Sequence, residues 1–318
     1  MMVFVHIPKT AGTSFTRGLE VQLGKDRIAY DFGTGFSRTS DIVREKVYTN
    51  DDYWGLRAGL ENSDVRVLSG HFEAKKYQFL FPITSFVTFL REPVQRFYSE
   101  YCHRKRRDFD RFDGSFMDYC KVEKFCNIQS RHLQDMPWSA FGFLGLTESY
   151  NKSLDLFESY CGIRVDRLEV NQNNQKGKGS YELSDAELSE AIKVNKKDCG
   201  LFKQVKDYFN ERIKCYENGS PFVMGQLQNV SNGNVFGFAC STDHTSYAQP
   251  VEVEILINGS VKARCLANQH RKRLQLFGVP RNGFVGFSTQ LELKAGDRVA
   301  ARVADTKQLL ASSMRFPG

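Results

Sequence analysis

The sequence lacks several features that mark whole classes of protein. No apolar run approaches the ~20 residues that a membrane-spanning helix needs. The eight cysteines form no CxxC pair, and no cysteine–histidine group has the spacing of zinc ligands. Their density is far below that of a disulfide scaffold, so we expect mostly reduced thiols. The first apolar run follows Met1-Met2 directly and leaves no room for a signal peptide, so we expect a cytoplasmic protein.

Length and composition are those of an ordinary soluble protein. The chain has 318 residues, of which 41% are hydrophobic and 25% charged. At about 150 residues per domain, this length favours two domains. The net charge of +7 fits an anionic ligand, although many proteins that bind no polyanion are equally basic.

Residues 1–216 alternate short apolar runs with helical patterns, which predicts an α/β domain. Strands are expected over 3–7, 66–70 and 85–90, and the first reads as buried on both faces. Helices are expected after residue 14, from Pro93 onward, and over 149–161, 184–195 and 200–213. Ser184 and Glu187 have the spacing of a capping box.

The pattern changes after Cys215. Residues 216–221 read as a linker, and period-2 alternation follows. The segments 251–257 and 261–265 flank Asn258-Gly259, the dipeptide of a type I′ hairpin turn. Further strands are expected at 284–287, 291–293 and 299–303. We therefore predict domains at 1–216 and 222–318, the second a small all-β sandwich.

The segment His6–Ser14 joins the first predicted strand to the first predicted helix. A strand, a tight loop and a helix N-terminus together form a site for phosphate, because loop amides and the helix dipole attract anions. Lys9 adds a cation, and the loop also contains hydroxyl donors. It is not a Walker A loop, because its lysine precedes Gly12. Taken alone, the segment also fits an ordinary turn.

A second strand–turn–helix segment spans Phe89–Tyr101. Arg91 ends its strand, at the sheet edge where open α/β folds bind ligands. Ser99 lies on the following helix, six residues past Pro93 and roughly 9 Å along the axis. An arginine and a serine at this offset can hold one phosphate from two sides. A salt bridge to Glu92 or Glu100 is the alternative for Arg91.

These two segments resemble the 5′-phosphosulfate and 3′-phosphate segments of sulfotransferases that use 3′-phosphoadenosine 5′-phosphosulfate (PAPS). The glycan-modifying branch, which includes heparan sulfate 2-O- and 6-O-sulfotransferases, is also similar at residues 69–72, 127–133 and 145–148. The resemblance extends from residue 3 to about 210. It implies a P-loop-like three-layer α/β/α sheet in the first domain.

The resemblance implies roles for individual residues. Lys9 would contact the phosphosulfate bridge, and Arg91 and Ser99 would bind the 3′-phosphate. The 5′-phosphate would be held by Thr10, Ala11, Gly12, Thr13 and Ser14. Lys176 and Lys178 lie in a loop that would close over the nucleotide, although a solvated linker fits that loop equally well.

His71 is the predicted general base, because it ends a strand at the same expected edge as Lys9 and Arg91 and stands in the position of the family's histidine base. Glu73 and Glu92 are the alternatives. His103, one helical turn past Ser99, is predicted to contact the acceptor, with an exposed helical histidine as the alternative. Arg131 is predicted to line the cleft, or else to be a buried structural arginine.

The sequence thus predicts an enzyme that transfers a sulfuryl group from PAPS to a hydroxyl of a carbohydrate acceptor, without a metal and without nucleic acid. The oligomeric state and the acceptor's identity are not specified by it. Two other functions stay open. One is a non-catalytic glycan-binding protein whose β domain is the working part. The other is a P-loop kinase or hydrolase, which would require a Walker A lysine and a Walker B aspartate that we do not find.

Overall fold

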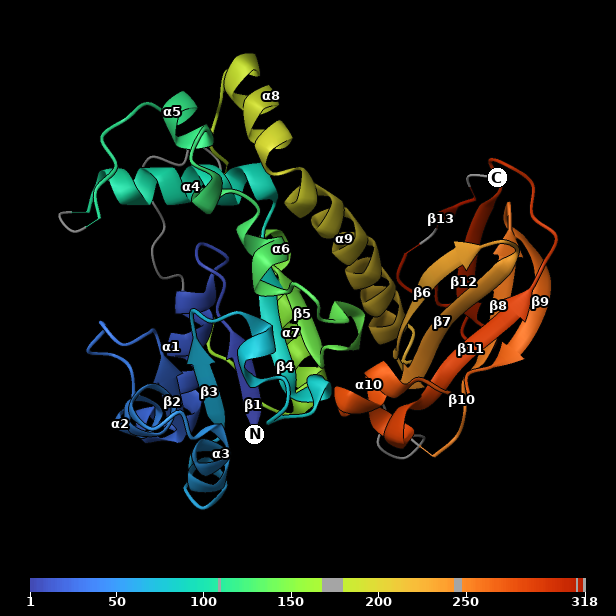
Figure 1. Ribbon diagram of the computed structural model, residues 1–318, viewed down its shortest axis with the longest axis horizontal. Coiled ribbons are helices and arrows are strands. Elements are labelled where there is room, and N and C mark those ends of the chain that lie inside the picture. The colour runs from blue at the N-terminus through green and yellow to red at the C-terminus, as the bar shows by residue number, and fades with distance from the viewer. Residues whose placement is uncertain (108–109, 168–179, 243–247, 313, 317–318) are drawn as a thin grey trace. The chain divides into compact units, whose positions relative to one another are not determined.

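The computed structural model describes residues 1–107, 110–167, 180–242, 248–312 and 314–316 (Figure 1). They form two compact units. The first comprises residues 1–80, 85–136 and 143–203, and the second comprises 81–84, 137–142 and 204–318. The second unit thus includes two short segments of the N-terminal half as well as the last part of helix α9. The division into sequence domains at 216–222 stays a prediction.

The first unit is built on a five-stranded parallel sheet with the order β2-β3-β1-β4-β5. Nearly all of its strand residues are buried, so protein covers both faces, as expected for a parallel sheet. The strands are β1 (Met2–Val5), β2 (Ile28–Asp31), β3 (Val67–Gly70), β4 (Phe86–Leu90) and β5 (Phe143–Leu146).

Helices connect these strands, and several further helices of the unit lie beyond the end of the sheet (Figure 1). They are α1 (Gly12–Leu23), α2 (Asp41–Val43), α3 (Tyr53–Glu61), α4 (Pro93–Lys105), α5 (Phe116–Cys120), α6 (Ile128–His132), α7 (Tyr150–Cys161), α8 (Asp185–Val194) and α9 (Lys196–Glu217). The capping box of α8 forms as predicted, with Ser184 and Glu187 each bonding the other's backbone. Helix α9 begins at Lys196, four residues before the predicted start.

The second unit contains two four-stranded antiparallel sheets, with the orders β10-β11-β7-β6 and β13-β12-β8-β9. Residues from both sheets form one apolar core, which includes Leu227, Val235, Ile255 and Val299. The elements are β6 (Val223–Ser231), β7 (Asn234–Ser241), β8 (Glu252–Ile257), β9 (Ser260–Leu266), β10 (Gln269–His270), α10 (Lys272–Leu276), β11 (Phe284–Gln290), β12 (Arg298–Val303) and β13 (Met314–Arg315).

Two sequence predictions for this unit have different outcomes. Asn258 and Gly259 have φ angles of 51° and 86°, as the predicted type I′ turn between β8 and β9 requires. The strand predicted at 291–293 is wrong. Leu291 and Leu293 pack against the core of the unit, but they lie outside its strands. Their alternation therefore reflects burial without strand pairing.

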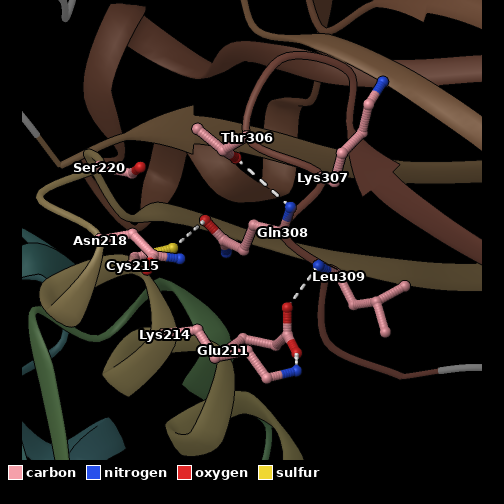
Figure 2. A pocket seen from close by; sticks show the side chains of 9 residues that line it. All are labelled: Glu211, Lys214, Cys215, Asn218, Ser220, Thr306, Lys307, Gln308 and Leu309. Atoms are coloured by element: carbon pink, nitrogen blue, oxygen red, sulfur yellow. Dashed lines mark hydrogen bonds and ion pairs between the residues drawn. The ribbon is translucent and has the colours of Figure 1, made fainter.

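Figure 2 shows a pocket between the end of α9 and the segment that follows β12. The Glu211 carboxylate accepts a hydrogen bond from the Leu309 amide at 2.8 Å and pairs with Lys214. The Gln308 side chain bonds both the amide (2.8 Å) and the carbonyl (2.7 Å) of Val223. These polar side chains thus fasten α9 and the following segment within the second unit.

All eight cysteines are free thiols. None of the helices in the described ranges combines the length and the apolar character needed to cross a membrane. The same residues contain no cluster of three or more potential metal ligands.

Candidate active site

Lys9, His71 and Arg91 follow β1, β3 and β4, which are neighbours in the sheet. Because parallel strands end at one edge, the structure brings these three predicted residues to the same side of the sheet. The loops are joined directly. The His6 amide donates to the Gly70 carbonyl at 2.9 Å, and the Arg91 guanidinium donates to the Lys9 carbonyl at 3.3 Å.

The loop after β1 has an unusual backbone. Lys9 and Ala11 adopt positive φ angles of 71° and 64°, which residues with a side chain rarely take. Ala11 is the N-cap of α1 and has no side-chain oxygen with which to cap the helix amides. Thr10 is buried and donates its hydroxyl to the Ile7 carbonyl at 2.9 Å. The amides at the start of α1 are therefore suited to binding an anion.

Gly12 is required by a close contact with the His6 ring. A Cβ atom at Gly12 would lie 2.1 Å from His6 Cδ2. His6 is buried, and its Nδ1 atom has no hydrogen-bond partner in the part of the chain that the structure describes. The ring also lies 4.5 Å from the ring of His71 in a T-shaped arrangement. His6 thus connects the loop after β1 to the predicted base.

Arg91 is buried and is held through its backbone. The Gln129 side-chain carbonyl accepts from the Arg91 amide at 2.8 Å, and the Gln129 amide donates to the Arg91 carbonyl at 2.9 Å. Over the described ranges, Arg91 forms no ion pair, so the predicted alternative of a salt bridge to Glu92 or Glu100 is wrong. Its guanidinium lies 5.9 Å from the centre of the Tyr181 ring.

Gln129 is positioned by a second buried group. The Asp198 carboxylate accepts from the backbone amides of Gln129 (3.1 Å) and Ser130 (2.7 Å) and so caps α6. Asn127 precedes this helix, and its backbone amide donates to the side-chain carbonyl of Asn195 at the end of α8, at 3.0 Å. The segment 127–133 thus holds the Arg91 backbone in place through Gln129.

The two predicted site residues of α4, Ser99 for the donor and His103 for the acceptor, lie one helical turn apart on the same side of that helix. Ser99 is buried, whereas His103 is half-buried, so the alternative of an exposed helical histidine is wrong. Burial and the positive charge of Lys9 lower the pKa of His103 to about 4. Burial likewise lowers the pKa of Lys9, and the nearby Arg91 charge contributes, while Glu100 opposes the change.

His71 directly follows β3, and its amide donates to the Asp31 carbonyl at 3.0 Å. Its side chain is exposed to solvent although protein atoms surround much of it. These surroundings lower the pKa of His71 to about 4, and the nearby His132, Arg38 and Arg107 contribute. The imidazole is therefore uncharged at neutral pH, which is the form a general base requires.

A buried carboxylate that the sequence did not reveal fastens the His71 segment. Asp31, at the end of β2, accepts hydrogen bonds from Lys76 (2.6 Å), Tyr77 (2.7 Å) and Tyr48 (2.6 Å). Lys76 and Tyr77 follow His71 in the chain. Asp31 was missed because the short run Ile28–Asp31 was not identified as a strand.

Arg38 and Phe32 are two further residues beside His71 that the sequence did not reveal. The edge of the Phe32 ring contacts the His71 ring, with centroids 4.8 Å apart. The Arg38 guanidinium lies 4.8 Å from the Phe32 centroid and 5.4 Å from that of Tyr30. Within the described ranges no carboxylate pairs with Arg38, and its neighbour Thr39 is buried and holds the loop through the Gly33 carbonyl.

Arg131, which was predicted to line the cleft, lies on α6. Arg131 is exposed and donates to the Lys124 carbonyl at 2.8 Å, so the alternative of a buried arginine is wrong. Its contact with substrate stays a prediction. Lys176 and Lys178 lie outside the described residues. Arg104, in the basic run after His103, pairs with Glu100 at 3.1 Å and also with Asp110.

The arrangement as a whole offers helix amides and Lys9 for one anionic group, Arg91 and Ser99 for another, and a neutral imidazole nearby. Such a site is suited to the transfer of a charged group.

Comparison of the sequence with known protein families agrees with transfer chemistry at this site. A family model described as "Sulfotransferase family" matches residues 1–203. No curated protein matches the chain significantly. Because the match covers more than half of the chain, including every donor-site residue described above, the chain belongs to the sulfotransferase family.

Proposed function

We propose that the chain transfers a sulfuryl group from PAPS to a hydroxyl of a carbohydrate acceptor. The observation that carries this proposal is the convergence of Lys9, Arg91 and His71 at one edge of the sheet, after three neighbouring strands. Sulfuryl transfer itself follows from the family. The donor's identity, the acceptor class and the residue roles are the proposed part.

The two ends of PAPS match the two anion-binding elements. The amides of α1 and the Lys9 ammonium would hold the phosphosulfate end. Arg91 and Ser99, both buried, would hold the 3′-phosphate. Arg91 supports this role because its guanidinium is fixed in place but is paired with no carboxylate among the described residues. A buried cation without a counter-ion is costly, and a phosphate would compensate it.

The reaction requires one proton transfer and one displacement at sulfur. The acceptor oxygen forms a new bond to sulfur while the bond from sulfur to the phosphate oxygen breaks, and that oxygen keeps the electron pair. The acceptor's hydroxyl proton passes to His71. The Lys9 ammonium stabilises the negative charge that develops on the leaving phosphate. The products are a sulfate ester and adenosine 3′,5′-bisphosphate.

The low pKa of His71 belongs to the protein without ligand. Arg38, Arg107 and His132 oppose its protonation. PAPS carries several negative charges, and these would raise the pKa of His71 toward the value suited to a general base. In this proposal the bound donor activates the base, so transfer begins only after the donor has bound.

The surroundings of His71 support a carbohydrate with an anionic substituent as the acceptor. Phe32 is half-buried beside His71, and the part of its ring that is exposed is available for contact with a sugar ring. Arg38 and Arg107 are exposed cations near His71. A planar guanidinium binds a carboxylate or a sulfate through paired hydrogen bonds.

Incubation with ³⁵S-labelled PAPS and a panel of acidic and neutral polysaccharides tests the proposal. We expect label in acidic polysaccharide. His71→Ala should lower the rate by ~10²–10⁴, as expected for loss of a general base. His270→Ala, which removes an exposed histidine of the second unit, should leave the rate unchanged. Equal rates for His71→Ala and the wild type would refute the assignment.

Ligand stabilisation separates this function from a kinase or hydrolase. Adenosine 3′,5′-bisphosphate should raise the melting temperature, and Lys9→Ala or Arg91→Ala should reduce that increase. ATP with Mg²⁺ should have a smaller effect, because the second anion site would lack its phosphate. Stabilisation by ATP with Mg²⁺ alone would contradict the proposal.

A further inference from the structure

The outer face of the sheet β13-β12-β8-β9 in the second unit carries an unusual concentration of positive charge. Alternate residues of β8, among them Val253 and Ile255, point into the core, so Glu254 points outward. We define the basic face by the outward positions of three strands and one following residue: Glu252, Glu254, Leu256, Val261, Lys262, Arg264, Leu266, Arg298, Ala300, Arg302 and Lys307.

Glu254 lies at the centre of this face and contacts three cations. Arg264 and Arg302 stand directly opposite it on the neighbouring strands β9 and β12. Their guanidinium nitrogens lie 2.8 Å and 2.7 Å from the carboxylate, and Lys307 Nζ lies 3.2 Å from it. In Figure 2 the Lys307 side chain points away from Glu211 and Leu309. The carboxylate therefore aligns three cations on one surface.

The cations cover Glu254 while staying in contact with water. The Glu254 side chain is only 1% exposed, whereas those of Arg264 and Lys307 are 60% and 51% exposed. Glu254 lies on the outer face, so its low exposure results from the side chains above it and not from depth in the core. The hydrogen bond from Arg302 lowers the pKa of Glu254 to about 2, with Lys307 contributing, so the carboxylate is charged at neutral pH.

One carboxylate neutralises one of these three cations, and two positive charges remain. The rest of the basic face adds the cations Lys262 and Arg298 and the anion Glu252, and Asp297 lies close enough to interact with Lys262. The excess over the face, with Asp297 included, is therefore two positive charges. A single cation would have satisfied Glu254. The additional ones repel each other, and an anionic ligand would offset that repulsion.

We propose that the basic face binds the chain of an anionic polysaccharide. Arg264 and Arg302 flank β8, and neighbouring strands are ~4.8 Å apart, so their backbones are about 10 Å apart and can hold an extended chain at two points. Both arginines have donors that Glu254 does not use, and these can bind a carboxylate or sulfate in pairs. The described residues of the face include no aromatic side chain, which single-stranded nucleic acids use for base stacking.

Binding of the full-length protein to dextran sulfate, measured against NaCl concentration, tests this inference. Uncharged dextran and a single-stranded oligo(dT) are the comparison probes. We expect binding to dextran sulfate and not to dextran. The double variant Arg264→Gln/Arg302→Gln should weaken binding roughly tenfold and reduce the salt slope by about two, one for each lost contact. The assay contains no PAPS, so its result is independent of sulfuryl transfer.

Three single variants make the test specific. Glu254→Gln removes the central negative charge without changing the side chain's size, so it should strengthen binding to dextran sulfate. Arg57→Gln removes an arginine of α3 that also forms an exposed ion pair, at 2.9 Å from Glu61, and should have no effect. Lys307→Gln should weaken binding even if the double variant folds poorly.

Three results would overturn the inference. The first is a loss in the double variant and in Lys307→Gln no larger than that in Arg57→Gln. The second is weaker or unchanged binding in Glu254→Gln, which would mean that the cluster only stabilises the fold. The third is oligo(dT) binding as tight as that of dextran sulfate with the same sensitivity to the variants, which would assign the face to nucleic acid.

Discussion

Gln129→Leu should weaken donor binding, although Gln129 is not expected to contact the donor. Its fully buried side chain makes two hydrogen bonds to the Arg91 backbone, at 2.8 and 2.9 Å. Leucine has a similar volume but no polar atoms. The substitution leaves the buried amide and carbonyl of Arg91 without these partners. Each unsatisfied group costs ~1–3 kcal/mol, so with two such groups the free energy of unfolding should fall by about 2–6 kcal/mol.

The effect on binding follows from the position of Arg91. Its guanidinium approaches the Lys9 carbonyl only because its backbone is fixed at the end of β4. Once that backbone can move, part of the binding energy is spent on ordering it again. We expect affinity for adenosine 3′,5′-bisphosphate to fall about tenfold, which corresponds to ~1.4 kcal/mol. Isothermal titration calorimetry measures the affinity, and urea unfolding measures the stability.

The second unit provides a matched control. Gln308 is 2% exposed and bonds the amide and carbonyl of Val223 in the same way, at 2.8 and 2.7 Å (Figure 2). Gln308→Leu should therefore destabilise its own unit by a similar amount and leave the affinity for adenosine 3′,5′-bisphosphate unchanged. The reasoning fails if Gln129→Leu lowers stability but keeps wild-type affinity, or if both variants weaken binding equally.

Three further predictions concern the loops of the site. Gly12→Ala forces a Cβ within 2.1 Å of His6 and should cost ~1–3 kcal/mol of stability with loss of transfer, whereas Gly200→Ala in open space should be neutral or stabilising, as thermal unfolding will show. His71 should titrate near pH 4 by NMR without ligand and at a higher pH with adenosine 3′,5′-bisphosphate. Because its folded pKa is lowered, its contribution to stability is present above pH 6.5 and decreases as the pH falls toward 4. Asp31→Asn removes the charge that holds the His71 segment, so kcat should fall while the affinity for adenosine 3′,5′-bisphosphate is kept.

The parts of the site that were predictable from sequence are those with local signals. Lys9, His71 and Arg91 each follow an apolar run, and β1, β3 and β4 form close to the predicted residues. The strands β2 and β5 were not predicted. They are as short as β1 and β3, but β2 contains Ala29 and Asp31 and β5 contains Gly145 in its interior, and these residue types are uncommon in strands. Residues 291–293 show the opposite error, since alternating leucines there are buried without pairing as a strand.

The supporting residues could not be predicted because their contacts join distant parts of the chain. Gln129 reaches Arg91 across 38 positions, and Asp198 reaches Gln129 across 69. No periodicity or composition connects such pairs. An isolated buried glutamine or aspartate indicates that a partner exists, but it does not indicate which one.

The charge of these supporting side chains explains why the site suits an anionic ligand. The loops after β1 and β4 are fastened by backbone hydrogen bonds and a packed ring, from Gln129 and His6, and these neutral groups add no negative charge to the site. Two carboxylates are exceptions. Asp31 is balanced by Lys76, and Asp198 accepts from the backbone amides of Gln129 and Ser130. The cations Lys9 and Arg91 thus lie near each other and form no ion pair among the described residues, and Glu100 and Glu148 offset only part of their charge. Their mutual repulsion lowers the free energy of unfolding. A ligand with several negative charges, as PAPS has, offsets this repulsion when it binds and so stabilises the folded protein.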